Sequence, residues 1–211
     1  MTNSAISRQI VVAITGASGA RYAQRLVECL SQGDAHVHLV ASPNGERLFR
    51  EELDVSSITP TAFSTASVGG MSMYSYKDVG AKIASGSFHT DGMIICPCSG
   101  NTLAAVAAGL GDNLIARSAA VTLKENRRLV LVTREMPLTQ IDLRNALHLS
   151  RAGATVCPAS PGFYMLPETV DDLVDFVVGK LLDLVGMPHE LNTRWASRLE
   201  PTGNSEDANH R

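Results

Sequence analysis

Short apolar runs alternate with amphipathic segments along this chain. The runs are continuous and rich in β-branched residues, which is typical of strands covered on both faces. They lie at residues 9–15, 37–41, 92–96, 129–133 and 154–157. Between them, apolar residues recur every three or four positions, which predicts helices. The predicted helices cover residues 20–30, 46–53, 103–108, 113–125, 138–150 and 170–185.

The last of these helices has the clearest pattern. Its valines and leucines fall at i, i+3, i+4, i+7 and i+8 from Val170, and they continue in one stripe to Val185. Thr169 is placed to cap the helix, and Gly186 suits its exit. Asp171 and Asp172 suit the positive end of the helix dipole, so we interpret this D-D-x-x-D sequence as a helix start and expect no metal site.

Alternation of strands and helices predicts an α/β fold. We expect a Rossmann-like, doubly wound and mostly parallel sheet with helices on both faces, in a single domain. The domain is expected to span residues 9–199, between a disordered N-terminus at 1–8 and a polar, disordered tail at 200–211. Residues 54–88 lack a regular pattern and are rich in Ser, Thr and Gly, so we interpret them as a cover over an active site.

Composition narrows the function. Hydrophobic residues make up 45% of the 211 residues and charged residues 18%, as expected of a folded protein. A net charge of −3 argues against nucleic-acid binding, and no apolar run approaches the roughly 18 residues that a membrane span needs. The N-terminus lacks the apolar core of a signal peptide, and four cysteines form no disulfide framework. These features favour a cytoplasmic protein.

Two glycine- and serine-rich loops follow predicted strands, where ligands bind in open parallel sheets. The first, residues 15–20, is Thr-Gly-Ala-Ser-Gly-Ala, whose backbone N–H groups can face an anion or a polar cofactor edge, although an ordinary tight turn is the alternative. It lacks the G-x-G-x-x-G spacing, and Ala41-Ser42-Pro43 supplies no acid for a ribose diol. The sequence therefore disfavours NAD and favours FMN.

The second loop, residues 97–102, places hydroxyls, an amide and free backbone donors at a helix start. It is either a second phosphate cradle or a simple N-cap formed by Ser99 or Asn101. Two such loops at neighbouring strand ends favour a shared ligand.

Charged residues cluster around a third strand end. Arg134 and Glu135 follow the strand at 129–133, and Arg117 and Lys124 lie seven residues apart on the preceding helix, so both can occupy one face. Cations converging on a pocket would bind a phosphate, and Glu135 could exchange a proton with it. For Arg117 and Lys124, a surface salt-bridge set is the alternative interpretation.

Taken together, these residues resemble the UbiX/Pad1 family of flavin prenyltransferases over nearly the whole chain, from Ile10 to Trp195. The markers share the family's order and spacing. They are Ile14 to Ala20 (ITGASGA), Ile83 to Phe88 (IASGSF), Cys96 to Ser99 (CPCS), Lys124-Glu125, Arg134 to Pro137 (REMP) and Pro161 to Tyr164 (PGFY).

The resemblance implies an FMN-dependent, metal-independent homo-oligomer, often a dodecamer, with the flavin at a subunit interface. Such enzymes join a dimethylallyl group from dimethylallyl monophosphate to N5 and C6 of reduced FMN, and the prenylated FMN serves a UbiD-type decarboxylase. By resemblance, the residues that would hold FMN are Gly16, Ala17, Ser18, Ser42, Ser99, Gly100, Asn101, Thr102 and Arg134. Those that would bind the prenyl donor are Arg117, Lys124, Tyr164, Lys180 and Trp195. The catalytic set would be Ser18, Glu52, Lys124 and Glu135, in which Glu52 and Ser18 would help to move protons near the flavin.

Two other functions remain open at this point. Residues 97–102 also resemble the P-A-S-A-N-T loop of FMN-dependent peptidyl-cysteine decarboxylases, with His89 as the nearest histidine to the irregular region. The third hypothesis is a protein that binds and carries a flavin without catalysing a reaction. The sequence leaves open whether the donor is a mono- or a diphosphate, and whether Ser18 or Glu135 delivers the decisive proton.

Overall fold

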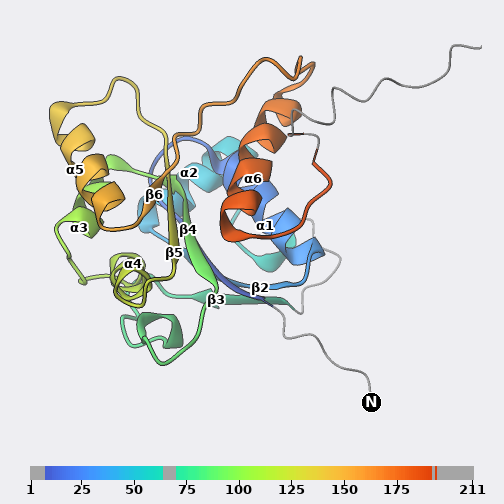
Figure 1. Cartoon of the computed structure of the whole chain (residues 1–211). Coiled ribbons are helices and arrows are strands. Elements are labelled where there is room, and N and C mark those ends of the chain that lie inside the picture. Colours follow the sequence, from blue (N-terminus) through green and yellow to red (C-terminus); the bar gives the residue numbers. More distant parts are fainter. Residues whose placement is uncertain (1–7, 64–69, 192, 194–211) are drawn as a thin grey trace, which may run out of the picture.

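One sheet of six parallel strands forms the centre of the molecule, in the order β3-β2-β1-β4-β5-β6 (Figure 1). The computed structural model describes residues 8–63, 70–191 and 193. Its strands are β1 (Arg8–Ile14), β2 (Ala35–Ala41), β3 (Met71–Tyr74), β4 (Gly92–Cys98), β5 (Arg128–Thr133) and β6 (Thr155–Val156). The order of the strands reverses at β1, which makes the carboxyl ends of β1 and β4 the topological switch point.

Helices cover both faces of this sheet, as predicted (Figure 1). They are α1 (Ala20–Gln32), α2 (Pro43–Leu53), α3 (Gly100–Ala107), α4 (Leu114–Lys124), α5 (Gln140–Arg151) and α6 (Val170–Val185). Alternate residues of β1 divide the core. Ile10, Val12 and Ile14 pack with α1 and α6, whereas Val11 and Ala13 pack with α3 and α4. Two short 3-10 helices, η1 (Pro60–Phe63) and η3 (Lys82–Ala84), contribute further buried residues.

The structure corrects the prediction for two of the strands. The region 54–88, expected to be irregular, contains β3, which pairs with β2 at the edge of the sheet. Its Met-Ser-Met-Tyr sequence carries no β-branched residue, and edge exposure removes the continuous apolar signal of a buried strand. The strand expected at residues 92–96, before Pro97, instead runs to Cys98. Its register with β5 shifts between Ile95 and Cys98, so the missing N–H of Pro97 falls where the ladder is already interrupted.

Helix α6 confirms its prediction. Thr169 and Asp172 form a capping box, and Gly186 ends the helix in the left-handed region with φ of 74°. The other two acids of the D-D-x-x-D sequence form ion pairs with α1: Asp171 with Arg21 at 2.9 Å and Asp175 with Arg25 at 2.6 Å. Each of the three carboxylates therefore has a structural partner. Within residues 8–63, 70–191 and 193, no helix is long and apolar enough to cross a membrane.

Candidate functional site

A cavity of about 480 Å³ opens at the carboxyl edge of the sheet, where the switch point lies. Its walls are formed by the loops that follow five different strands, β1 to β5. The lining residues are Gly16, Ser42, Pro43, Asn44, Tyr76, Ser99, Gly100, Asn101, Thr102 and Glu135. The two loops that the sequence singled out thus meet in one cavity, with Glu135 beside them.

The N-termini of two helices, α2 and α3, line this cavity. Ser42 caps α2 by accepting from the Gly45 N–H at 3.1 Å, and Ser99 caps α3 by accepting from the Thr102 N–H at 3.3 Å. The capping interpretation of Ser99 is therefore correct, and the cradle interpretation is compatible with it. Both helix dipoles are positive at the cavity, which suits a phosphate group.

Glycines allow α2 to approach the first loop closely. A Cβ added at Gly16 would lie 2.7 Å from the Cβ of Asn44, and one added at Gly45 would overlap the carbonyl of Ile14. Larger residues at either position would push the N-terminus of α2 away from the loop. The close approach places Asn44 in the wall of the cavity.

Two side chains from elsewhere in the chain hold the first loop. The Glu52 carboxylate, from the last turn of α2, accepts hydrogen bonds from the backbone N–H groups of Gly19 (2.9 Å) and Ala20 (2.8 Å). It supplies the cap that α1 lacks at Gly19, whose φ is 127°. Arg134 donates from Nε to the carbonyl oxygen of Ser18 at 3.1 Å. Glu52 and Arg134 therefore fix the loop from opposite sides, and Ser18 between them is exposed.

Lys124 lies elsewhere in the chain. It is the last residue of α4, just before β5 begins, so it sits at the amino edge of the sheet, whereas Arg134 follows the carboxyl end of the same strand. Six residues of extended strand separate the two edges by about 20 Å. The exposed Lys124 ammonium pairs with Glu125 at 3.3 Å, and both side chains pack against Gly86 of the IASGSF segment. One copy of the chain does not bring Lys124 to the cavity.

The other donor-site residues also lie outside the cavity lining. Arg117 is exposed on the first turns of α4, and Lys180 is exposed on α6. Tyr164 stands 45% exposed, its ring in edge contact with Phe176 at a centroid distance of 5.5 Å. Trp195 and the predicted tail at 200–211 fall outside the described residues, as do residues 1–7 of the N-terminal segment predicted at 1–8. The prediction of disorder is wrong at Arg8, because this residue begins β1 and pairs with Ala35 of β2.

Sequence reasoning missed three residues of the cavity wall. Pro43 and Asn44 were missed because α2 was expected to begin near Glu46, although Ser42-Pro43 is a recognisable cap followed by a first-turn proline. Tyr76 follows the unpredicted strand β3, and its carbonyl accepts from the N–H of Leu114 at the start of α4. Burial, and secondarily the charge of Asp112, raise the pKa of the Tyr76 phenol, which therefore stays a hydrogen-bond donor at neutral pH.

The fold, with this cavity at its switch point, is that of a flavoprotein, and residues 2–182 match the Flavoprotein family model. A flavin prenyltransferase UbiX of Halalkalibacterium halodurans is 52% identical over 193 residues, covering 90% of this chain and 94% of that protein. The chain belongs to the UbiX family of flavin prenyltransferases.

Solved structures agree with this assignment. AnUbiX (PadA1), in complex with FMN and dimethylallyl pyrophosphate, superposes with a TM-score of 0.79 at 39% identity, covering 94% of this chain and 99% of its own. A dodecameric FMN-dependent UbiX-like decarboxylase from Escherichia coli O157:H7 gives 0.80 at 42% identity, covering 89% and 98%. By contrast, a PPC decarboxylase matches at 19% identity with a TM-score of 0.57, which shows a shared fold alone.

Proposed function

We propose that this enzyme transfers a dimethylallyl group from dimethylallyl monophosphate to N5 and C6 of reduced FMN, giving prenylated FMN. The observation that carries the proposal is the convergence of two capped helix N-termini on the cavity beside the Arg134–Ser18 loop. Such a cradle suits the phosphate of a mononucleotide. Membership of the UbiX family and the ligands of AnUbiX support the same substrates.

FMN would occupy the cavity with its phosphate at the starts of α2 and α3. Ser42 and the segment from Ser99 to Thr102 would hold that end. The flavin ring would then extend along Gly16, Ala17 and Ser18 toward Arg134. Pro43, Asn44 and Tyr76 extend the set that the sequence predicted.

The prenyl donor would bind between copies of the chain. Lys124 lies about 20 Å from the edge that carries Arg134, so we assign the Lys124 of one copy to the cavity of another. Tyr164, Lys180 and Arg117 are exposed and outside the lining of their own cavity, which fits the same arrangement. A homo-oligomer, proposed as a dodecamer, follows from this assignment and agrees with the E. coli relative.

These residues suit a transfer that needs no metal ion. As the C–O bond of the donor breaks, Lys124, Arg134 and Lys180 would neutralise the departing phosphate, and Glu135 or Ser18 would move the proton that it needs. Reduced FMN supplies the electron-rich atoms that accept the allylic carbon.

The two alternatives have weaker support. The peptidyl-cysteine decarboxylase reading rests on the resemblance of one loop, and the PPC decarboxylase match shares the fold at 19% identity. A carrier without chemistry gives no reason for Glu135 to face the phosphate cradle. We also propose that the enzyme works in the cytoplasm, since its four cysteines are all free thiols, and that a UbiD-type decarboxylase uses its product.

Anaerobic incubation with reduced FMN and dimethylallyl monophosphate, followed by mass spectrometry of the extracted flavin, tests the proposal. We expect a flavin heavier by one C5 unit. Lys124→Ala and Glu135→Gln should abolish that product while FMN still binds, and Arg47→Ala, an exposed cation on α2, should leave it unchanged. Unmodified FMN from intact protein would contradict the proposal, and carbon dioxide released from a peptidyl-cysteine substrate would favour the decarboxylase.

A further inference from the structure

Thr15 lies beneath the cavity and joins its two main loops. The residue is 1% exposed and follows β1 directly. Its Oγ1 donates to the carbonyl oxygen of Pro97 at 2.7 Å and accepts from the backbone N–H of Ser99 at 2.8 Å. The backbone N–H of Thr15 also donates to Pro97, at 3.2 Å. A single hydroxyl therefore connects the end of β1 to both sides of the turn that leads into α3.

The Thr15 hydroxyl makes its hydrogen bonds beyond the point where β1 and β4 pair with each other. Ladder pairing between β1 and β4 ends at Ala13 and Ile95, two residues before Thr15 and Pro97. Beyond that point the Thr15 bonds continue the connection between the two loops. Ser42 joins the same junction, since its N–H donates to the carbonyl of Ile14 at 2.9 Å. The three loops that carry the phosphate cradle are thus tied at residues 14 and 15.

We propose that Thr15 is a positioning residue that sets the distance between the first loop and the N-terminus of α3, and thereby the affinity for FMN. This inference rests on the proposed assignment of FMN to the cavity. Thr15 is buried under the loops, so it acts through Gly16 and Ser99, which line the cavity. Preorganised donors bind an anion more tightly than donors that must first be brought together.

The hydroxyl, rather than the shape of the side chain, is the feature that matters. Thr15→Val keeps the shape but leaves the Ser99 N–H without its acceptor, so the turn before α3 must move to find another one. Thr15→Ser keeps the hydroxyl and loses a methyl group, so it should restore binding. Thr122→Val is the matched control, because Thr122 is 3% exposed and its hydroxyl donates to Ser118 within α4, remote from the phosphate cradle.

FMN titration of the full-length protein tests the proposal, with thermal unfolding of each apoprotein beside it. We expect the Kd for FMN to rise about tenfold in Thr15→Val and to stay within about twofold of wild type in Thr15→Ser and Thr122→Val. With saturating FMN, kcat and the KM for the prenyl donor should stay near the wild-type values in all three variants. If Thr15→Val does not fold, Thr15→Ala removes the same hydroxyl and takes its place.

The outcomes separate this proposal from the proposed function. Unchanged FMN affinity in Thr15→Val, or an equal loss in Thr122→Val, would overturn the positioning role and leave the prenyl transfer intact. Wild-type protein that binds FMN but forms no prenylated flavin would overturn the prenyl transfer, and the titration would still decide the role of Thr15. Wild-type protein that binds no FMN would overturn both.

Discussion

Arg134 donates from Nε to the carbonyl oxygen of Ser18 over 3.1 Å, and this bond joins the loop after β5 to the loop after β1. The two strands are not neighbours, because β4 lies between them. Arg134 therefore bridges the switch point on its exposed side, above the buried bridge made by Thr15. The first loop is held from both directions before any ligand enters.

Replacing Arg134 with lysine should weaken FMN binding. Lysine keeps the charge, but its single ammonium lacks the planar fork that lets a guanidinium bond Ser18 and still present donors to a ligand. We expect the Kd for FMN to rise about tenfold in Arg134→Lys, measured by quenching of flavin fluorescence.

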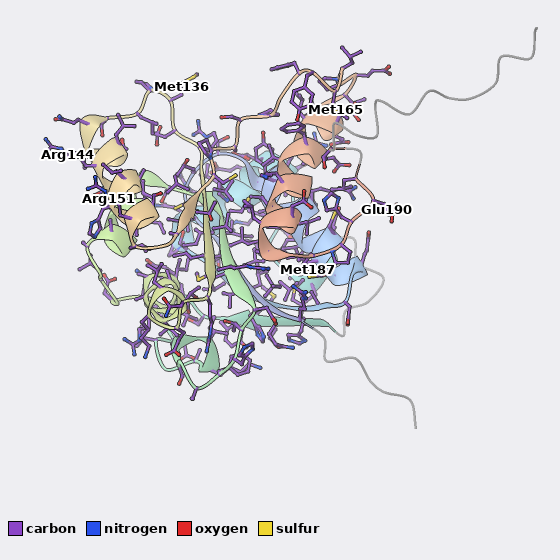
Figure 2. All side chains as sticks on the ribbon, viewed as in Figure 1. Met136, Arg144, Arg151, Met165, Met187 and Glu190 are labelled. Carbon is purple, nitrogen blue, oxygen red and sulfur yellow. The ribbon has the colours of Figure 1, made fainter. Side chains whose placement is uncertain are left out.

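Arg151→Lys is the control for this change. Arg151 is exposed at the end of α5 and points away from the sheet, as does Arg144 (Figure 2). Its variant should bind FMN like the wild type. Equal affinities of Arg134→Lys and wild-type protein would show that the bridge to Ser18 contributes nothing to the site.

Glu52 should contribute to the stability of the fold, in addition to any role in proton transfer. Glu52→Gln keeps one acceptor oxygen but loses the charge that faces the N-terminus of α1, so we expect the free energy of unfolding to fall by about 0.5–1 kcal/mol. Glu51→Gln, on the exposed surface one residue earlier, should change it by less. Urea unfolding of both variants makes the comparison.

Activity of Glu52→Gln separates the two roles. A loss of turnover much larger than the loss of FMN affinity would support the proton-transfer role that the resemblance implies. Loss of both in parallel would mean that Glu52 acts through the position of Gly19 and Ala20 alone.

Mixed oligomers should recover activity from two inactive variants. If Lys124 of one copy completes the cavity that carries Glu135 of another, co-expressed Lys124→Ala and Glu135→Gln chains form some sites with both groups intact. Random assembly at equal amounts gives about a quarter of the wild-type turnover. Differently tagged chains, purified together and assayed for prenylated flavin, provide the measurement. Recovery no greater than that of separately purified variants mixed before the assay would place both residues in one chain's site.

His38 should make the fold sensitive to acid. It is completely buried on β2, with Nδ1 2.9 Å from the Tyr74 hydroxyl and Nε2 2.8 Å from Oε1 of Gln9. Burial, with the nearby charges of His36 and Lys82, lowers the pKa of His38 to about 4. The unfolded chain binds this proton near pH 6.5 and the native chain does not, so stability falls as the pH drops from about 6.5 to 4, by up to about 3 kcal/mol.

Removing the His38 imidazole should make the free energy of unfolding less dependent on pH. We expect His38→Gln to lose stability at pH 7 but to show a shallower decline between pH 6.5 and 4 than the wild type, as measured by urea unfolding at a series of pH values. His148→Gln, on the exposed face of α5, should keep the wild-type slope. An unchanged slope in His38→Gln would assign the acid sensitivity to other groups.

Local patterning determined most of the elements. The stripe from Val170 to Val185, with Thr169 and Gly186 at its ends, specified α6 residue by residue, because caps and periodicity are properties of neighbouring positions. The β-branched runs specified the buried strands in the same way. The edge strand β3 was not predicted, because its pairing with β2 and its half-exposed position, rather than its own residues, make it a strand.

The sequence alone also pointed to the two loops, to Glu135 and to the family, because glycine, serine and charge at strand ends are local signals. Tertiary structure decided which of those residues meet. It brought Asn44 and Tyr76 into the cavity wall. It also placed the Glu52 carboxylate at the N-terminus of α1, and Lys124 at the opposite edge of the sheet from Arg134. The spacing of residues along a helix determines which of them lie on the same face of that helix. Strand order and direction, which depend on contacts distant in sequence, decide which edge of the sheet that face reaches.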